Sequence, residues 1–501
     1  MHGEGVIYQN QVVVYNTLSR QKEVFEPLHA PFVGMYACGP TVYSEPHLGN
    51  CRSFTMYDLM FRYLTHLGYK VRYLRNITDA GHVESTSGEA GDRISKQAKL
   101  EQVEPMEIVQ KYTVKFHWIM DMLNSLPPSI EPTATGHIVE QIEMTKTIME
   151  NGFAYETPEA IYFDVEKFNA TYPYTKLSGR NLDELLNNTR ELDGQSSKRG
   201  RLDFALMIKA KPEHIMRWPS PWGDVYPGWH IECSAMSTKY LGKTFDIHCG
   251  GMDLIPTHHT NEIAQSIACN HTEPVKYWLH PNMLTVNGQK MSKSLGNAFL
   301  PAELFEGTHP LLDKGYSPMT VRFSMLQAHY RSTLDFSNDA LKAAEKGYKR
   351  LMAAQQLLEN LQATDQPNAA DEAAVNKILV GVYAGMNNDF NAAQTIAELS
   401  EAASMINTWN DQHNKVASIS AFTLERLKKT YATFLFDIFG LRQETEGDNS
   451  KLSGVMDLVI DIRKDARSKK DFATSDKIRD ALTAVGIQLK DSKEGTSWES
   501  N

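Results

Sequence analysis

Short apolar runs and helical repeats follow one another near the start of the chain in the order strand, helix, strand. Residues 32–37 form an apolar run that ends at Cys38, which predicts a buried strand followed by a turn. Over residues 48–67 apolar side chains recur at helical spacing, and Gly68 then ends the repeat. Residues 71–74 predict the next strand. This succession predicts a βαβ unit of a parallel sheet.

The same pattern returns farther along the chain. Residues 245–248 have the pattern of a short strand that runs into Cys249, a helical repeat covers 258–270, and residues 278–286 have the pattern of another strand. We therefore predict a strand, a helix and one further strand that complete the parallel sheet. The intervening residues, about 125–220, combine helical stretches with polar segments and a proline-rich break, which indicates an insertion within the sheet domain.

The last third of the chain has a different pattern. Beyond about residue 335 the apolar positions recur with the helical period, which predicts a helical bundle. Residues 443–450 are polar and contain glycine, as is typical of a linker. Two further helical repeats, 452–467 and 472–485, and a short segment at 487–489 after Gly486 then predict a small separate unit.

Composition narrows the class of protein. The 501 residues are enough for about two to four domains. No run of about 18 apolar residues occurs, which excludes a membrane-spanning helix. Five cysteines without a compact framework suit a reducing compartment, so we predict a cytoplasmic protein. The net charge of −10 disfavours a nucleic-acid partner, and composition alone favours a small-molecule enzyme, although a local basic patch would still bind phosphates.

Two short motifs contain the residue types that an ATP site needs. The 47–50 motif (His-Leu-Gly-Asn) falls where the first strand passes into a helix, whose N-terminal amides favour phosphate. Taken alone, it is more often an ordinary helix cap. The 290–294 motif (Lys-Met-Ser-Lys-Ser) combines two lysines and two hydroxyls in a glycine-flanked loop. Such a loop brings a lysine to the charge that grows on departing phosphates, and this interpretation is favoured over a solvated basic turn.

Four residues from three distant segments are candidate metal ligands. Cys38 ends a strand, Cys233 lies at a predicted helix start, and His258 and Glu262 share one helix face at i, i+4 spacing. Two thiolates, one imidazole and one carboxylate suit tetrahedral zinc. No C-x-x-C spacing supports the set, so buried core thiols stay open as the alternative. The competing ligands are Cys249, His248 and His259.

A basic stretch near the C-terminus is the clearest local candidate for contact with nucleic acid. Seven lysines and arginines face three acids between residues 463 and 479, and Phe472 lies among them. On charge alone, a solvated amphipathic helix pair explains the stretch better.

Together these segments resemble the cysteinyl-tRNA synthetases, a family of class I aminoacyl-tRNA synthetases. Residues 36–43 are similar to the opening segment of the family, residues 47–50 to its HIGH signature, and residues 290–294 to its KMSKS signature. The likeness covers nearly the whole chain, and the blocks that contain cysteine are specific to this amino acid. Further similar blocks are 75–79, 227–236, 258–262, 334–337, 388–391 and 471–479.

The resemblance implies a fold and a reaction. The reaction is ATP-dependent activation of L-cysteine to cysteinyl-adenylate, followed by transfer to tRNA(Cys). The fold is an α/β Rossmann-like class I catalytic domain with an insertion, followed by an α-helical bundle and a small C-terminal anticodon-binding domain. The implied bounds are 1–300 for the catalytic domain, 301–345 for a connecting region, 346–442 for the bundle and 451–501 for the last domain.

The resemblance also implies roles for single residues. In the family, two cysteines, one histidine and one glutamate bind zinc. They correspond to Cys38, Cys233, His258 and Glu262, with one ion per chain. A zinc-bound thiol deprotonates readily whereas a serine hydroxyl is a poor ligand, so no separate editing domain is needed. The remaining expected roles are catalysis by His47, Lys290 and Lys293, ATP binding at His47, Gly49, Asn50 and Lys293, and cysteine binding by Gly39, Thr78, Trp229 and His248, with Mg²⁺ accompanying the ATP.

The chain departs from the family pattern at a few positions. The HIGH signature ends in Asn50, so that a neutral amide replaces the second imidazole. Cys249 stands where glycine is more usual, and Thr260 replaces a common glutamate. Residues 80–82 read Ala-Gly-His in place of a lysine-containing stretch.

Two alternatives belong to other functional classes. One is a related ligase that activates cysteine in the same way and joins it to an amino sugar, and the basic C-terminal unit argues against it. The other is a zinc-stabilised RNA-binding protein without catalysis, which has no need of an intact KMSKS loop.

Overall fold

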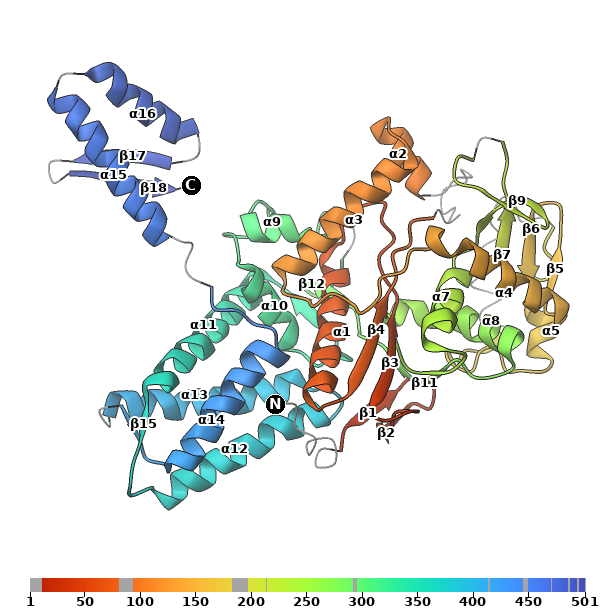
Figure 1. Cartoon of the computed structure of the whole chain (residues 1–501), viewed down its shortest axis with the longest axis horizontal. Helices are drawn as coiled ribbons and strands as arrows, with labels where there is room; N and C mark the ends of the chain where they lie inside the picture. Colours follow the sequence, from red (N-terminus) through yellow and green to blue (C-terminus); the bar gives the residue numbers. More distant parts are fainter. Residues whose placement is uncertain are drawn as a thin grey trace. The chain divides into compact units, whose positions relative to one another are not determined.

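The computed structural model describes residues 11–80, 93–182, 197–212, 214–291, 295–412, 415–444, 449–469, 471–484, 487–492 and 495–500. The chain divides into two compact units, Met1–Arg442 and Gln443–Asn501 (Figure 1). Among the described residues, no helix combines the length and the apolar character that crossing a membrane requires.

A four-stranded parallel sheet forms the centre of the first unit, and the predicted βαβ unit is confirmed. The strands follow the order β11 (Val275–Leu279), β10 (Phe245–Cys249), β3 (Phe32–Ala37) and β4 (Lys70–Arg75), and every neighbouring pair is parallel. Helix α1 (Leu48–His66) connects β3 to β4. Since strands and crossover helix follow the order of open α/β sheets, ligands are expected at the carboxyl ends of the strands.

The predicted single strand over residues 278–286 is wrong. Two strands occupy this region, β11 in the central sheet and β12 (Leu284–Val286) in a separate one. Pro281 lies between them and has no N–H to continue a ladder, so the chain leaves the sheet there. Strand β12 then pairs in parallel with β14 (Leu334–Phe336) and antiparallel with β13 (Gln289–Lys290).

The insertion has its own antiparallel sheet, which runs in the order β5, β6, β7, β9 and β8 and lies to the right of the central strands in Figure 1. Strand β9, the last of the five along the chain, ends beyond the boundary that was expected near residue 220. The elements are α4 (Ile138–Glu150), β5 (Ala154–Glu156), β6 (Ala160–Phe163), α5 (Val165–Asn169), β7 (Phe204–Lys209), β8 (Trp218–Ser220) and β9 (Gly223–Pro227).

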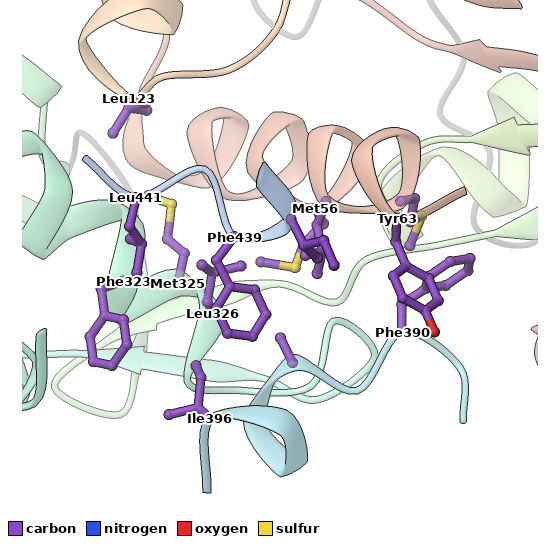
Figure 2. Packing of buried hydrophobic residues seen from close by; sticks show 14 of the residues in the cluster. Met56, Tyr63, Leu123, Phe323, Met325, Leu326, Phe390, Ile396, Phe439 and Leu441 are labelled. Carbon is purple, nitrogen blue, oxygen red and sulfur yellow. The ribbon is translucent and has the colours of Figure 1, made fainter. Parts of the chain in front are cut away.

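Helices that follow the sheet in the sequence pack against α1 and bury it. Figure 2 shows Met56 and Tyr63 of α1 facing Phe439 and Phe390, and all four are at most 1% exposed. These side chains belong to one continuous apolar cluster that joins the sheet domain to the bundle. The elements are α9 (Pro301–Glu306), α10 (Pro318–Leu326), α11 (Asn338–Asn360), α12 (Ala369–Asn387), α13 (Ala392–Gln412), α14 (Ala421–Ala432) and η5 (Thr433–Ile438).

A buried carboxylate reinforces the same junction. Asp58 of α1 accepts hydrogen bonds from Arg62 at 2.8 Å and from Arg322 of α10 at 2.5 Å. Arg322 also donates to the carbonyl of Phe439, just beyond the last helical turn. Removing one member of such a buried network leaves an unpaired charge, so the junction depends on all of them. Other elements of this unit are β1 (Val13–Asn16), β2 (Gln21–Val24), α2 (Arg93–Glu101), α3 (Pro105–Met122), η1 (Thr135–His137), β15 (Gln362–Ala363) and β16 (Val416–Ala417).

The second unit consists of α15 (Asn449–Ser468), α16 (Phe472–Ala484) and a hairpin of β17 (Ile487–Ser492) with β18 (Gly495–Ser500). Both predicted helices are confirmed. The second strand of the hairpin was not predicted, since its sequence is mostly polar. The basic stretch offers fewer cations to a partner than its composition suggests, because Arg463 is only 5% exposed and Arg479 pairs with Asp476 at 3.1 Å.

Candidate active site and metal centre

Four of the predicted ligand residues meet at the carboxyl edge of the central sheet. Cys38 follows β3 directly, and its peptide N–H donates to the carbonyl of Cys249 at 3.1 Å. Cys233 lies in the first turn of α7 (Ile231–Leu241). A π-helical turn, η3 (Ile255–His259), presents His258 just before Glu262 in α8 (Thr260–Asn270). The ligand atoms of Cys38, Cys233, His258 and Glu262 all lie within 4.8 Å of one another.

A second set of possible ligands overlaps the first. Cys38 and Glu262 also lie within 4.8 Å of His248 and His259. The Cys38 Sγ is 3.4 Å from His259 Nε2, and His248 Nε2 is 2.9 Å from the second oxygen of Glu262. Of the competing ligands named from the sequence, the two histidines therefore reach the cluster. Among the residues that the structure describes, Cys249 belongs to neither set.

Electrostatics separate the two thiols. Burial raises the pKa of Cys38 well above the usual value. Burial also raises the pKa of Cys233, but the hydrogen bond from Cys38 and the charge of His258 outweigh it and hold that pKa at about 6. For Glu262, burial raises the pKa, whereas the imidazoles of His248 and His258 outweigh it and lower the value to about 2. The cluster thus holds a thiolate and a carboxylate at neutral pH.

These donors suit zinc by their chemistry. Two sulfur atoms favour zinc over magnesium or calcium, and one imidazole and one carboxylate complete a tetrahedral set. The His258 ring is fixed from behind, because its Nδ1 lies 2.8 Å from Nδ1 of His230. A partner of this kind orients a metal-binding imidazole, which indicates a site prepared for an ion.

A small cavity of about 60 Å³ opens beside the cluster. Its wall includes Gly39, Thr78 and Trp229, three of the four residues expected to contact cysteine. A Cβ atom at Gly39 would lie 1.5 Å from the carbonyl oxygen of Asn76, so only glycine fits there. The fourth expected residue, His248, is not among the residues that line this cavity. It lies behind Glu262 and is 1% exposed.

Polar side chains fix the floor of the cavity. The amide oxygen of Asn76 accepts from the peptide N–H of Gly39 at 2.8 Å, and its amide N–H donates to Thr78. The Thr78 hydroxyl in turn donates to Glu232 at 2.8 Å. Burial, together with the neighbouring Cys233, raises the pKa of Glu232 well above its usual range. The cavity is therefore small, preformed and polar on one side.

The two motifs that are expected to bind ATP approach one another at the start of α1. His47 is the N-cap residue, its Nδ1 accepts from the peptide N–H of Asn50, and the Asn50 side chain accepts from the peptide N–H of His47. This reciprocal cap gives Asn50 a structural role that its neutral amide can perform. At Gly49, a Cβ atom would lie 3.0 Å from the His47 ring and 3.5 Å from Met291. The KMSKS motif therefore begins next to the HIGH-like motif.

Of the two lysines of the KMSKS motif, Lys290 lies among the described residues. Lys290 ends β13 and is exposed, and its carbonyl accepts from the Asn297 side chain at 3.3 Å. Residues 292–294, which include Lys293, lie outside the described residues.

Sequence reasoning missed several residues that support the cluster. Besides His230, the ring of His280 contacts His259 at 2.8 Å and the hydroxyl of Thr17 at 2.7 Å. Burial lowers the pKa of His280 to about 3, so this imidazole is neutral. Glu232, next to Cys233 in the sequence, was the only such residue that proximity to a proposed ligand could have indicated.

Comparisons with known proteins show which families the chain is similar to. Residues 24–346 match the family described as tRNA synthetases class I (C) catalytic domain, and residues 381–443 match the DALR domain. The chain is similar to proteins named Cysteine--tRNA ligase from Phocaeicola vulgatus, at 55% identity, and from Porphyromonas gingivalis, at 53%. Each alignment spans 496 residues, 98% of this chain and 100% of the relative.

A solved structure supports the fold alone. The methionyl-tRNA synthetase of Mycobacterium tuberculosis in complex with methionyl-adenylate is similar, with a TM-score of 0.57 and 13% sequence identity. The match covers 81% of this chain and 89% of that protein.

Proposed function

Since the chain belongs to the cysteine--tRNA ligase family of class I aminoacyl-tRNA synthetases, we propose that Cys38, Cys233, His258 and Glu262 hold one zinc ion that selects cysteine. The observation that carries this proposal is the convergence of two thiols, one imidazole and one carboxylate within 4.8 Å at the strand ends. When bound, zinc would favour the sulfur of cysteine as a thiolate over the hydroxyl of serine. Discrimination through such a group reaches about 10⁴ to 10⁵.

The chain's own residues orient cysteine beside this cluster. We propose that Gly39, Thr78 and Trp229 contact the amino acid, because they line the small cavity. His248 is proposed to act indirectly: it forms a hydrogen bond with Glu262 and holds that carboxylate in position. The cysteine carboxylate then attacks the α-phosphorus of ATP in line, which gives cysteinyl-adenylate and pyrophosphate. The terminal ribose of tRNA(Cys) attacks the adenylate carbonyl, and AMP leaves.

The other end of the site is proposed to bind ATP with Mg²⁺. Gly49 allows close approach of phosphates to the first amides of α1, and the exposed His47 contributes a donor there. Lys290 and Lys293 supply positive charge from the KMSKS loop, and Asn50 holds the helix start in shape. This division makes Lys293 the main contact to the departing pyrophosphate.

The other expectations are proposals as well. The unit after residue 450 is proposed to bind the anticodon through exposed lysines and arginines, among them Lys464 and Arg467. The bounds 1–300, 301–345, 346–442 and 451–501 are proposed as functional domains. A cytoplasmic location is proposed because all five cysteines are free thiols.

One pair of assays tests the proposed function. Purified protein should exchange pyrophosphate into ATP in the presence of cysteine and should charge tRNA(Cys). It should also contain about one zinc per chain. Cysteine-dependent exchange without charging would favour an amino-sugar acceptor, and tRNA binding without exchange would favour an RNA-binding protein.

A further inference from the structure

A second, larger cavity lies outside the site described above. Its volume is about 490 Å³, which is in the range of pockets that bind nucleoside-sized ligands. Residues from the end of β1, from 177–179 of the insertion and from the segment after β10 line it. Its polar lining includes Tyr15, Thr17, Arg20, Ser178, His280 and Arg331.

One short segment separates this cavity from the amino-acid pocket. Leu254 of η2 (Met252–Leu254) lines the small cavity, whereas Met252 and Ile255 line the large one. Hydrogen bonds also connect the two, because Thr17 contacts His280 and His280 contacts His259 beside Cys38. The two cavities are therefore adjacent, and a strand that reaches the small cavity can run along the large one.

The charge of the large cavity is opposite to that of the whole protein. Two arginines and no carboxylate are among the described residues that line it, although the net charge of the chain is −10. Arg331 is held in place, since its Nε donates at 2.6 Å to Asp389, which is fully buried. Its guanidinium lies 4.2 Å from the ring centre of Tyr15 and is still one third exposed. Such a fixed planar fork suits phosphate.

The backbone of Arg20 has a left-handed conformation, and its side chain lines the cavity. It has a φ of 59° and is exposed, and its guanidinium lies directly on Gly179. A Cβ atom at Gly179 would be 1.4 Å from Nη2 of Arg20, and Gly179 itself has a φ of 62°. A left-handed conformation is uncommon for arginine, so packing must hold it there. Gly179 therefore provides the space that this cation occupies.

We propose that Arg20 and Arg331 bind the phosphodiester backbone at the single-stranded 3′ end of tRNA, as the terminal ribose approaches the amino-acid pocket. This inference rests on the proposed function. ATP has a separate phosphate-binding region at the start of α1, where the two nucleotide motifs meet, so the large cavity is left for a different phosphate. The cavity lies between the sheet edge and the insertion, and its two cations suit backbone recognition that is independent of base identity.

The test compares Arg20→Ala with Arg426→Ala, which removes an exposed arginine from α14 instead. Arg20→Ala should raise the KM for tRNA about tenfold, the scale of one lost arginine contact, and should leave cysteine-dependent pyrophosphate exchange unchanged. The slope of log affinity against log salt should become shallower by about 0.7, as expected for one contact to a single strand. Gly179→Ala should reproduce this effect by displacing Arg20. Arg426→Ala should change neither quantity.

Binding to tRNA that lacks its 3′-terminal nucleotides distinguishes the phosphate sources. The affinity loss caused by Arg20→Ala should vanish with the shortened tRNA, because both changes remove the same contact. An equal loss with intact and shortened tRNA overturns the proposal. A raised KM for ATP in the exchange assay overturns it in favour of a free-nucleotide site. If the unaltered protein shows no cysteine-dependent exchange, the proposed function fails, and tRNA binding still tests Arg20 by itself.

Discussion

The two ends of the proposed active site are built in different ways. At the amino-acid end, side chains from three segments meet in the interior, where His258 and Glu262 are at most 2% exposed. At the ATP end, the cap of α1 presents backbone amides, and His47 and Lys290 are exposed. The first end has its geometry fixed by packing, and the second depends on a helix terminus and a loop. Variants at the first should therefore change which amino acid is used, and variants at the second should change how fast it is activated.

The largest effect is expected for Cys233→Ser. This variant should lose most of its zinc, and its cysteine-dependent pyrophosphate exchange should fall by about 10⁴, the scale of a lost coordinating contact. Serine should become a relatively better substrate. Metal analysis and exchange assays with both amino acids measure the two effects. Cys249→Ala is the matched control. Cys249 is also a buried thiol, and its carbonyl accepts from the peptide N–H of Cys38, but its removal should leave the zinc in place. Zinc at full occupancy in a double variant that lacks Cys38 as well as Cys233 would falsify the assignment.

A smaller effect, confined to the other end, is expected for Lys293→Ala. Adenylate formation should fall by about 10² or more, because one preorganised positive charge is lost in the transition state. Zinc content and cysteine affinity should stay the same. The control is Lys377→Ala, which removes an exposed lysine from α12. An unchanged exchange rate in Lys293→Ala would remove this residue from the ATP end.

Variants of the adjacent histidines His258 and His259 distinguish the two possible ligand sets at the amino-acid end. His258 belongs only to the two-thiol set, and His259 only to the set with one thiol. His258→Gln should abolish most zinc binding, whereas His259→Gln should weaken it by about 10- to 100-fold, as expected for an outer partner. Competition with a chelator gives both affinities. If His259→Gln loses the metal while His258→Gln keeps it, the ion is bound by the other set.

The smallest effect tests whether both ends work without the last unit. A chain that stops at residue 446 should retain zinc and pyrophosphate exchange. Its charging of tRNA should fall on the order of tenfold, the scale of one or two lost arginine contacts. Charging should also become less sensitive to salt as phosphate contacts are lost. Normal charging by the shortened chain would show that this unit does not bind the tRNA.

Local patterns predicted the elements that depend on local order. Strands β3 and β4 and helix α1 could be predicted because the spacing of apolar residues in each segment reflects the side chains that it buries. The end of β11 before Pro281 was not predicted, because apolar residues occur on both sides of this proline. The five strands of the insertion could not be paired from the sequence, since their register depends on partners far along the chain.

The site shows the same division. His258 and Glu262 were expected on one helix face, and spacing alone suffices for that. No spacing predicts that His280 contacts His259, or that Asn76 contacts Gly39, because tertiary structure brings them together. The two cysteines were only candidates until the resemblance to a family made them expected ligands, and composition alone pointed away from a nucleic-acid partner.

The separation of Cys38 and Glu262 along the chain has a consequence for biosynthesis. The two residues are 224 positions apart, yet their side chains lie 3.9 Å from each other in the folded protein. At a synthesis rate of about 5–20 residues per second, roughly 10–45 s pass between the appearance of one and of the other. Throughout that interval the Cys38 thiol on the nascent chain has only part of its ligand set. Loading of the metal is therefore expected to follow synthesis of the first half of the protein and to depend on what protects this thiol until then.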